Sequence, residues 1–210
     1  MKEINTDQLQ KALISAAKLI IENEPYLTEV DTIIGDGDHG SGMKMGFTAL
    51  LGLLQNQKYE TLYELLHASG LELIRTMGGA SGVLFGTLFI GGLSVVEGKQ
   101  AMKVDELVDY FNEGTEAVMR RGRCGPGSKT MIDALVPAMD AMKKEMVSNF
   151  NILDVLGAGV AGAKQGVENT KHMIPTTGRA KNFREEAIGY PDPGAISVSI
   201  LFEGLVKGIQ

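Results

Sequence analysis

The sequence predicts an all-α protein that folds as a single domain over residues 1–210. Three observations predict this class. Apolar residues recur at helical spacing along most of the chain, as Leu9, Leu13 and Ile20 show at its start. The links between such segments are short, and no segment alternates long enough to make a convincing strand. A hydrophobic fraction of 44% in 210 residues is sufficient for one buried core.

Each helix is predicted from its own periodicity and end signals. The first covers about 9–21, with Asn5 or Thr6 available as its N-cap. Further helices are expected at 40–56, 60–77, 80–97, 104–121, 130–147, 153–171 and 194–208. Asp192 can cap the last helix while Pro193 takes its first position, where a missing N–H costs nothing. Short links between consecutive helices predict that they pack as antiparallel neighbours.

Composition excludes several classes of function. The net charge is −6, and the basic run from Arg120 to Arg123 is too short to predict nucleic acid as a partner. A single cysteine cannot form an internal disulfide. The N-terminus is polar, and the longest apolar run, Gly82–Val96, is shorter than the roughly 20 residues of a membrane span. That run is predicted to be a buried helix, and the expected location is the cytoplasm.

Three aspartates lie close together in the stretch EVDTIIGDGDHGSGMKMG, which begins at Glu29. Asp31, Asp36 and Asp38 repel one another unless a cation or a hydrogen-bond network neutralises them. Oxygen ligands select hard ions, and the calcium loop of an EF-hand is excluded because its twelfth position here is Phe47. A magnesium–phosphate site and a solvated acidic loop are the two readings that remain. His39 is expected in the same loop, either packed or in contact with a ligand.

A second stretch, GRCGPGSKT at residues 122–130, is not a P-loop. Ser128 separates Gly127 from Lys129, and the residues before it have a helical pattern where a P-loop needs a strand. Thr130 with Asp133 instead predicts a capping arrangement for the next helix. The loop itself is expected to line a pocket.

Glycine is unusually frequent for a helical chain, with 27 residues. Close helix packing explains Gly86, Gly91 and Gly92, because each interior helical glycine otherwise costs about 0.5–1 kcal/mol. The segment GGASG, residues 78–82, stands between two helices, where free amides can face an anion at a helix N-terminus. The long irregular stretch 172–193 is expected to be functional, and its Arg179 is a cation suited to phosphate.

Five motifs follow one another along the chain: GDGDHGSGM, MGGASGVLFGTLF, RGRCGPGSKTMIDALVPAM, TTGRA and GYPDPGA. Taken together, they resemble the L subunits of dihydroxyacetone kinases, in particular the type that depends on the phosphotransferase system. The resemblance covers nearly the whole chain, and the combination is specific although each motif alone is not.

The resemblance implies a fold and a set of site residues. The fold would be a barrel of eight antiparallel helices with the nucleotide site at one end. Asp31, Asp36 and Asp38 would bind two Mg²⁺ ions, and Arg179 and His39 would have the catalytic roles. The residues implied in binding ADP or ATP are His39, Gly40, Ser41, Gly42, Ala80, Ser81, Gly122, Met131, Arg179, Asp192, Pro193 and Gly194.

The resemblance also implies a reaction and partners. A phosphohistidine on the M subunit of the phosphotransferase system would rephosphorylate bound ADP. The γ-phosphoryl would then pass to dihydroxyacetone held by a separate K subunit. A homodimer is considered, and no membrane or nucleic acid is involved. Two alternatives stay open: a subunit that uses freely exchanging ATP as donor, and a non-catalytic nucleotide-binding regulatory module.

Overall fold

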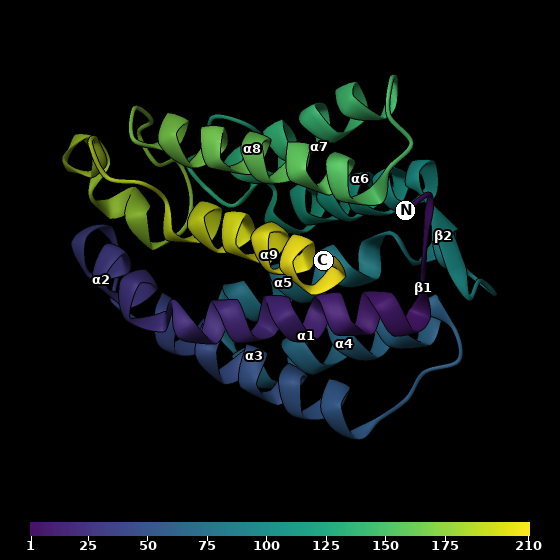
Figure 1. Ribbon diagram of the computed structural model, residues 1–210. Coiled ribbons are helices and arrows are strands. Elements are labelled where there is room, and N and C mark those ends of the chain that lie inside the picture. The colour runs from purple at the N-terminus through teal and green to yellow at the C-terminus, as the bar shows by residue number, and fades with distance from the viewer.

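The computed structural model describes all residues, 1–210, and is almost entirely helical (Figure 1). Its α-helices are α1 (Thr6–Glu22), α2 (Glu24–Ile34), α3 (His39–Asn56), α4 (Leu62–Met77), α5 (Gly79–Gly91), α6 (Val104–Gly122), α7 (Ile132–Met146), α8 (Ile152–Thr170) and α9 (Pro193–Ile209). The 3-10 helices are η1 (Leu93–Val96), η2 (Arg179–Asn182) and η3 (Arg184–Ala187), and the strands are β1 (Glu3–Asn5) and β2 (Ala101–Lys103).

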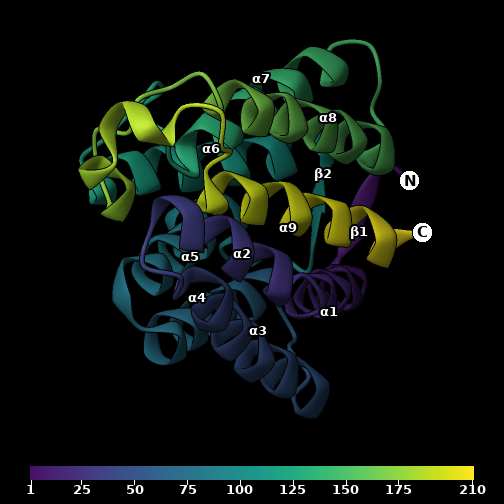
Figure 2. The same ribbon diagram turned by 90° about the vertical axis from the view of Figure 1, so that its left-hand side faces the viewer.

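Eight of the helices form a closed ring. Each packs on the next in the order α1, α3, α4, α5, α6, α7, α8, α9, and α9 returns to α1. Neighbours in this ring run in opposite directions in both ribbon views (Figures 1 and 2). Because most links are only a few residues long, each helix must turn back beside its predecessor. The predicted barrel of eight antiparallel helices is therefore confirmed.

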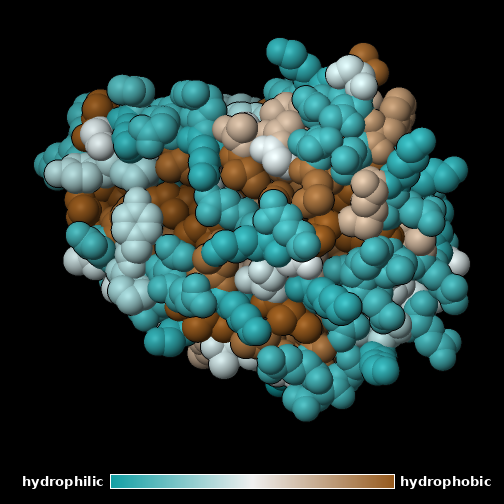
Figure 3. Space-filling view, in the orientation of Figure 1, coloured by the Kyte–Doolittle hydropathy of each residue, from teal (hydrophilic) through white to brown (hydrophobic).

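The interior of the ring is filled with side chains. A continuous cluster of buried apolar residues includes members of all eight ring helices, so the barrel is a packed core and not a channel. Aromatic rings meet in it, with Phe111 against Phe202 and Phe47 edge-on to Phe85. On the outside, hydrophilic residues dominate and apolar atoms show mainly in the furrows between them (Figure 3).

The caps predicted for the first and last helices are confirmed. Asn5 and Gln8 form a reciprocal capping box at the start of α1. The carboxylate of Asp192 accepts the N–H of Ala195 at 2.7 Å, with Pro193 at the first position of α9. The eight helices expected from periodicity all occur, with ends within about three residues of prediction apart from the helix expected at 80–97.

Three predictions about elements were wrong. The chain forms α2, which was not expected, so Asp31 lies on a helix and only Asp36 and Asp38 lie in the following loop. The helix expected at 80–97 is divided into α5 and η1. Strands were not expected, yet β1 and β2 pair antiparallel, with Ile4 opposite Met102, both of them buried.

The most apolar stretch of the chain, Gly79–Val96, has the composition and length of a membrane span. In the structure it is divided between α5 and η1 and packs on α4 and α6. The 13 residues of α5 make a helix of about 20 Å, shorter than the roughly 30 Å of a bilayer core. Its prediction as a buried helix is confirmed only in part: Phe85, Leu88 and Phe89 lie in the core, but the helix ends at Gly91 and 44% of the stretch is buried.

The glycines of α5 allow close contact with its two neighbours. A Cβ on Gly86 would lie 2.3 Å from Ile74 Cγ1 and 2.7 Å from the carbonyl oxygen of Gly70 on α4. A Cβ on Gly91 would lie 2.6 Å from Ala117 on α6, and one on Gly92 would lie 2.2 Å from the carbonyl oxygen of Tyr110. The packing explanation for these glycines is confirmed.

Candidate functional site

One end of the barrel carries a cavity of about 540 Å³. Figure 2 looks onto this end, where α2 and the segment between α8 and α9 lie outside the ring. The wall is built from the α2–α3 loop, the starts of α3, α5 and α9, the loop before α7, and residues 177–180. Its residues therefore come from segments that are far apart in the sequence. The opposite end of the barrel carries β1, β2 and the N-terminus (Figure 1).

The three aspartates meet on one side of this cavity. Oxygens of Asp31, Asp36 and Asp38 lie within 4.8 Å of one another. Asp31 comes from α2 and is only 6% exposed, and its Oδ2 accepts the backbone N–H of His39 at 3.0 Å. The turn between them requires glycine at Gly37, whose φ is +76°.

These carboxylates have the arrangement that Mg²⁺ needs. Two oxygens on one Mg²⁺ ion are at most about 4.2 Å apart, so oxygens that all lie within 4.8 Å of one another are near enough to share an ion after a small shift. Partial loss of solvent around the otherwise exposed Asp38, and then the neighbouring charges of Asp36 and Asp31, raise its pKa. Arg179 Nε lies 2.9 Å from Asp36 Oδ2, but this exposed pair leaves the other two carboxylates without a cation. The donor set therefore fits one or more hard divalent ions.

His39 is held between two serines as the first residue of α3. Its Nε2 lies 2.8 Å from Ser197 Oγ, and its Nδ1 lies 3.4 Å from Ser81 Oγ. Because the Ser197 hydroxyl donates to the carbonyl of Pro193, it must accept from His39 Nε2–H. Burial lowers the pKa of His39, so the ring is neutral near pH 7 and Nδ1 is its acceptor.

The N-terminus of α5 opens into the same cavity. Gly78 and Gly79 have φ values of +67° and +59°, and no other group lies within 4 Å of a Cβ built on either. No side chain caps this helix, so the first amides, through Ser81, lack a partner within the helix. Unpaired amides and the positive end of the helix dipole together favour an anion such as phosphate.

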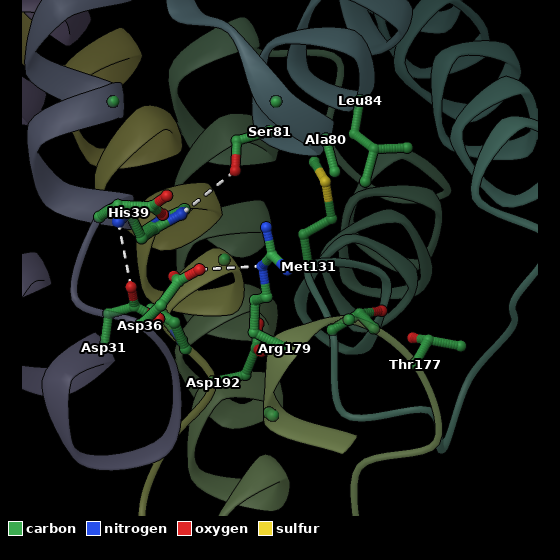
Figure 4. A pocket seen from close by; sticks show the side chains of 18 of the residues that line it. Asp31, Asp36, His39, Ala80, Ser81, Leu84, Met131, Thr177, Arg179 and Asp192 are labelled. Carbon is green, nitrogen blue, oxygen red and sulfur yellow. Dashed lines mark hydrogen bonds and ion pairs between the residues drawn. The ribbon is translucent and has the colours of Figure 1, made fainter. Parts of the chain in front are cut away.

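The cavity has an apolar side opposite the acidic one. Figure 4 shows Asp31, Asp36 and His39 on one side and Ala80, Leu84 and Met131 on the other, with Arg179 between them. Met77 and Phe85 also belong to the wall. A ligand with a flat apolar part and a multiply charged part would match both sides.

Two further helix starts complete the wall. Asp133, which is buried, accepts the N–H of Gly127 at 2.5 Å and of Thr130 at 2.8 Å, and the Thr130 hydroxyl accepts from Ile132 N. The predicted capping arrangement before α7 is confirmed in part: Asp133 reaches back to Thr130 N, but the N-cap residue is Met131 and it makes no side-chain cap bond. Burial raises the pKa of Asp192, the cap of α9, to about 7.

The structure brings most, but not all, of the predicted site residues to the cavity. Gly40, Ser41 and Gly122 are not part of its wall. Gly40 packs against Thr28 and the Glu24 carbonyl on α2, Ser41 donates to the Asp38 carbonyl, and Gly122 ends α6 beside Cys124. Those in the wall are Asp31, Asp36, Asp38, His39, Gly42, Ala80, Ser81, Met131, Arg179, Asp192, Pro193 and Gly194.

Some wall residues were not assigned from the sequence. Lys129 is in the wall although it was considered only within a rejected P-loop. Its φ of +58°, unusual for lysine, is a property of the fold that no sequence pattern reveals. Leu84 and Thr177 were also missed, because an apolar helical residue and a loop threonine carry no signal of their own.

This ring of eight helices, with an acidic cluster and an unpaired helix N-terminus at one end, defines a class of helical nucleotide- and metal-binding domains. The chain belongs to the DAK2 domain family, which matches residues 33–207.

The chain is also similar to individual subunits and structures of dihydroxyacetone kinases. The chain is 32% identical, over 96% of both chains, to the ADP-binding subunit DhaL of the PEP-dependent dihydroxyacetone kinase of Escherichia coli K12. It is 34% identical, over 91% of both, to a second DhaL subunit from Listeria innocua. The crystal structure of the dihydroxyacetone kinase from C. freundii with AMP-PNP and Mg²⁺ superposes with a TM-score of 0.75 and 26% identity, covering 99% of this chain and 35% of that one.

Proposed function

We propose that this chain is the nucleotide-binding subunit of a dihydroxyacetone kinase. In this proposal it holds ADP or ATP with two Mg²⁺ ions, is rephosphorylated by a phosphohistidine partner of the phosphotransferase system, and passes the γ-phosphoryl to dihydroxyacetone on a separate K subunit. The observation that carries it is the meeting of three carboxylates and an uncapped helix N-terminus in one cavity. The names of the DhaL relatives support the reaction and the need for partners.

In this proposal the phosphates of the nucleotide lie on the acidic side of the cavity, and the base and sugar lie on its apolar side. Asp31, Asp36 and Asp38 would hold the Mg²⁺ ions, which when bound neutralise phosphate charge and orient the transferred group. The amides at the start of α5 would donate to phosphate oxygens, and the apolar side with Met131 would contact the base and sugar.

Two side chains have catalytic roles in this proposal. Arg179 would release Asp36 and turn its guanidinium to the transferred phosphoryl, a short movement for an exposed side chain. His39, neutral and fixed by Ser197, would accept the hydroxyl of Ser81 at Nδ1 and so hold the Ser81 side chain in place beside the phosphates. Phosphoryl transfer needs positioning and charge neutralisation, so no nucleophile of the protein is required.

Direct use of exchangeable ATP is the second candidate. The observation in its favour is the similarity to the C. freundii kinase, whose structure contains AMP-PNP, an ATP analogue, with Mg²⁺. Both candidates use the same residues and differ in whether ADP leaves the cavity between turnovers.

Native mass spectrometry of the freshly purified chain, without added nucleotide, tests the proposal. A mass excess of ADP plus two Mg²⁺ that survives buffer exchange supports a retained nucleotide and a phosphoprotein donor. A bare chain that takes up added Mg²⁺–ATP supports the exchanging kinase. A wild-type chain that binds neither nucleotide with Mg²⁺ present contradicts both. The same spectrum reports whether the chain is a homodimer, and fractionation of cells tests the proposed cytoplasmic location.

A further inference from the structure

Lys129, in the loop before α7, is almost completely buried, with 1% of its surface exposed. Its ammonium group forms no ion pair but donates to three backbone carbonyls. The distances from Nζ are 2.6 Å to Thr170, 3.0 Å to Ala187 and 2.7 Å to Tyr190. All three N–H donors of the side chain are therefore used within the protein.

The three carbonyls belong to the two ends of one loop, residues 171–190. Thr170 is the last residue of α8, and Ala187 and Tyr190 lie shortly before α9. Two more hydrogen bonds join these ends, from Gly189 N to the Lys171 carbonyl at 2.7 Å and from Asp192 N to Thr170 Oγ1 at 2.9 Å. Lys129 therefore lies at the neck of a loop whose two ends are close together.

The tip of this loop is part of the cavity. Thr177, Gly178 and Arg179 belong to its wall, and Arg179 reaches across to Asp36 (Figure 4). At the tip the Thr176 N–H bond to the Ser128 carbonyl, at 3.2 Å, and the exposed Arg179 pair join the loop to the rest of the chain, while η3 packs on α2. With so few polar contacts at the tip, the position of Arg179 depends in large part on how the neck is held.

A charged group suits this position better than an apolar one. Three carbonyls, two of them in buried hydrogen bonds, would lose their donor if Lys129 were replaced by an apolar residue. Asp133 and Asp192, the carboxylates that cap the starts of α7 and α9, oppose through their charges the lowering of the Lys129 pKa that burial causes. The ammonium thus binds the neck of the loop and is also attracted by the charges of two carboxylates at helix starts in the cavity wall.

We propose that Lys129 is a positioning residue, which closes the neck of the 171–190 loop and so holds Arg179 over the acidic side of the cavity. The holding of the loop follows from the contacts of Lys129 alone. The benefit to a bound nucleotide rests on the proposed function. The two parts are tested separately.

Hydrogen exchange of the ligand-free chain tests the holding of the loop. In Lys129→Met, amides of peptides covering 171–192 should exchange at least about tenfold faster than in wild type, because the neck has lost three charge-assisted bonds. Lys164→Met, which removes an exposed lysine paired with Glu203, should leave the loop unchanged. Leu9→Ala, in the core portion of α1, controls for global destabilisation. Unchanged loop exchange, or an increase spread over the whole chain as in Leu9→Ala, overturns the proposal.

A double-mutant cycle tests the positioning of Arg179. Arg179→Ala should weaken Mg²⁺–ATP binding about tenfold in wild type but less than about twofold in Lys129→Met, where Arg179 is no longer held. Equal effects in both backgrounds overturn the positioning role. If Lys129→Met does not fold, Lys129→Gln, whose amide can serve two of the three carbonyls, carries both measurements. A wild-type chain that binds no nucleotide refutes the proposed function, while hydrogen exchange still decides the role of Lys129.

Discussion

At the scale of single residues, the ionisation of Asp192 makes the stability of the fold depend on pH. Burial raises its pKa to about 7, whereas an unfolded aspartate titrates near about 4. Between these values the folded chain holds a proton that the unfolded chain has released, so this residue makes stability fall as pH rises from about 4 to 7. Above about pH 7 both states are ionised and the slope ends.

In Asp192→Asn this decrease in the free energy of unfolding with rising pH should be absent. In wild type the decrease due to Asp192 is at most about 1.4 kcal/mol per pH unit. Asparagine keeps an acceptor for the Ala195 N–H but cannot ionise. Urea unfolding of the ligand-free chain at a series of pH values measures the difference from wild type. Asp140→Asn, an exposed residue of α7, is the control. If the profiles of Asp192→Asn and wild type run parallel, Asp192 does not titrate as stated.

Asp38→Asn should separate ligand binding from stability. Binding of ADP that depends on Mg²⁺ should weaken at least about tenfold, because one charged ligand is lost. The free energy of unfolding without ligand should stay equal or rise by less than about 0.5 kcal/mol, since repulsion from Asp36 and Asp31 is relieved at an exposed position. Titration calorimetry and urea unfolding measure the two effects, with Asp109→Asn on α6 as the control. Unchanged ADP binding would exclude Asp38 as a metal ligand.

At the scale of elements, the differences from prediction have local causes. In α2, β-branched residues of low helix propensity fill the second half. Only Asn23 separates α2 from α1, so its apolar pattern merges with that of its neighbour. The strands are too short to show alternation and depend on each other for their pairing. In contrast, the start of α9 could be predicted because the Asp192–Pro193 pair is a local signal.

Two glycine substitutions compare a closely packed position on α5 with an open position on α3. Gly86→Ala should lower the free energy of unfolding by about 1–3 kcal/mol, because the new methyl group would collide with Ile74 and the Gly70 backbone. Gly52→Ala on α3 meets no atom within 4 Å and should raise it by about 0.5–1 kcal/mol through helix propensity alone. Denaturant unfolding compares the pair. Equal effects of the two substitutions would contradict close packing of α4 on α5.

At the scale of the whole molecule, the acidic end of the barrel could be predicted only in part. The carboxylates and the GGASG segment carry chemistry in their composition, so the sequence alone indicated a magnesium–phosphate site as one of two readings. The role of Lys129 depends on contacts with residues 41 to 61 positions away, which no local pattern contains. The closed ring was expected from the family resemblance, and helical periodicity predicted only that helices occur and where they begin and end.

The net charge of −6 and the acidic cluster predict that Mg²⁺ and nucleotide stabilise this molecule only together. ADP alone brings further negative charge to three carboxylates, whereas Mg²⁺ neutralises both sets of oxygens. At about one hundred times the dissociation constant, Mg²⁺–ADP should stabilise the folded chain by about 2.7 kcal/mol, which corresponds to roughly 5–10 °C in melting temperature. Thermal melts with ADP, with Mg²⁺, with both, and with both plus EDTA measure this coupling. Asp36→Ala should show no increase with both ligands present. An equal increase with ADP alone would mean that the carboxylates do not act through a metal ion.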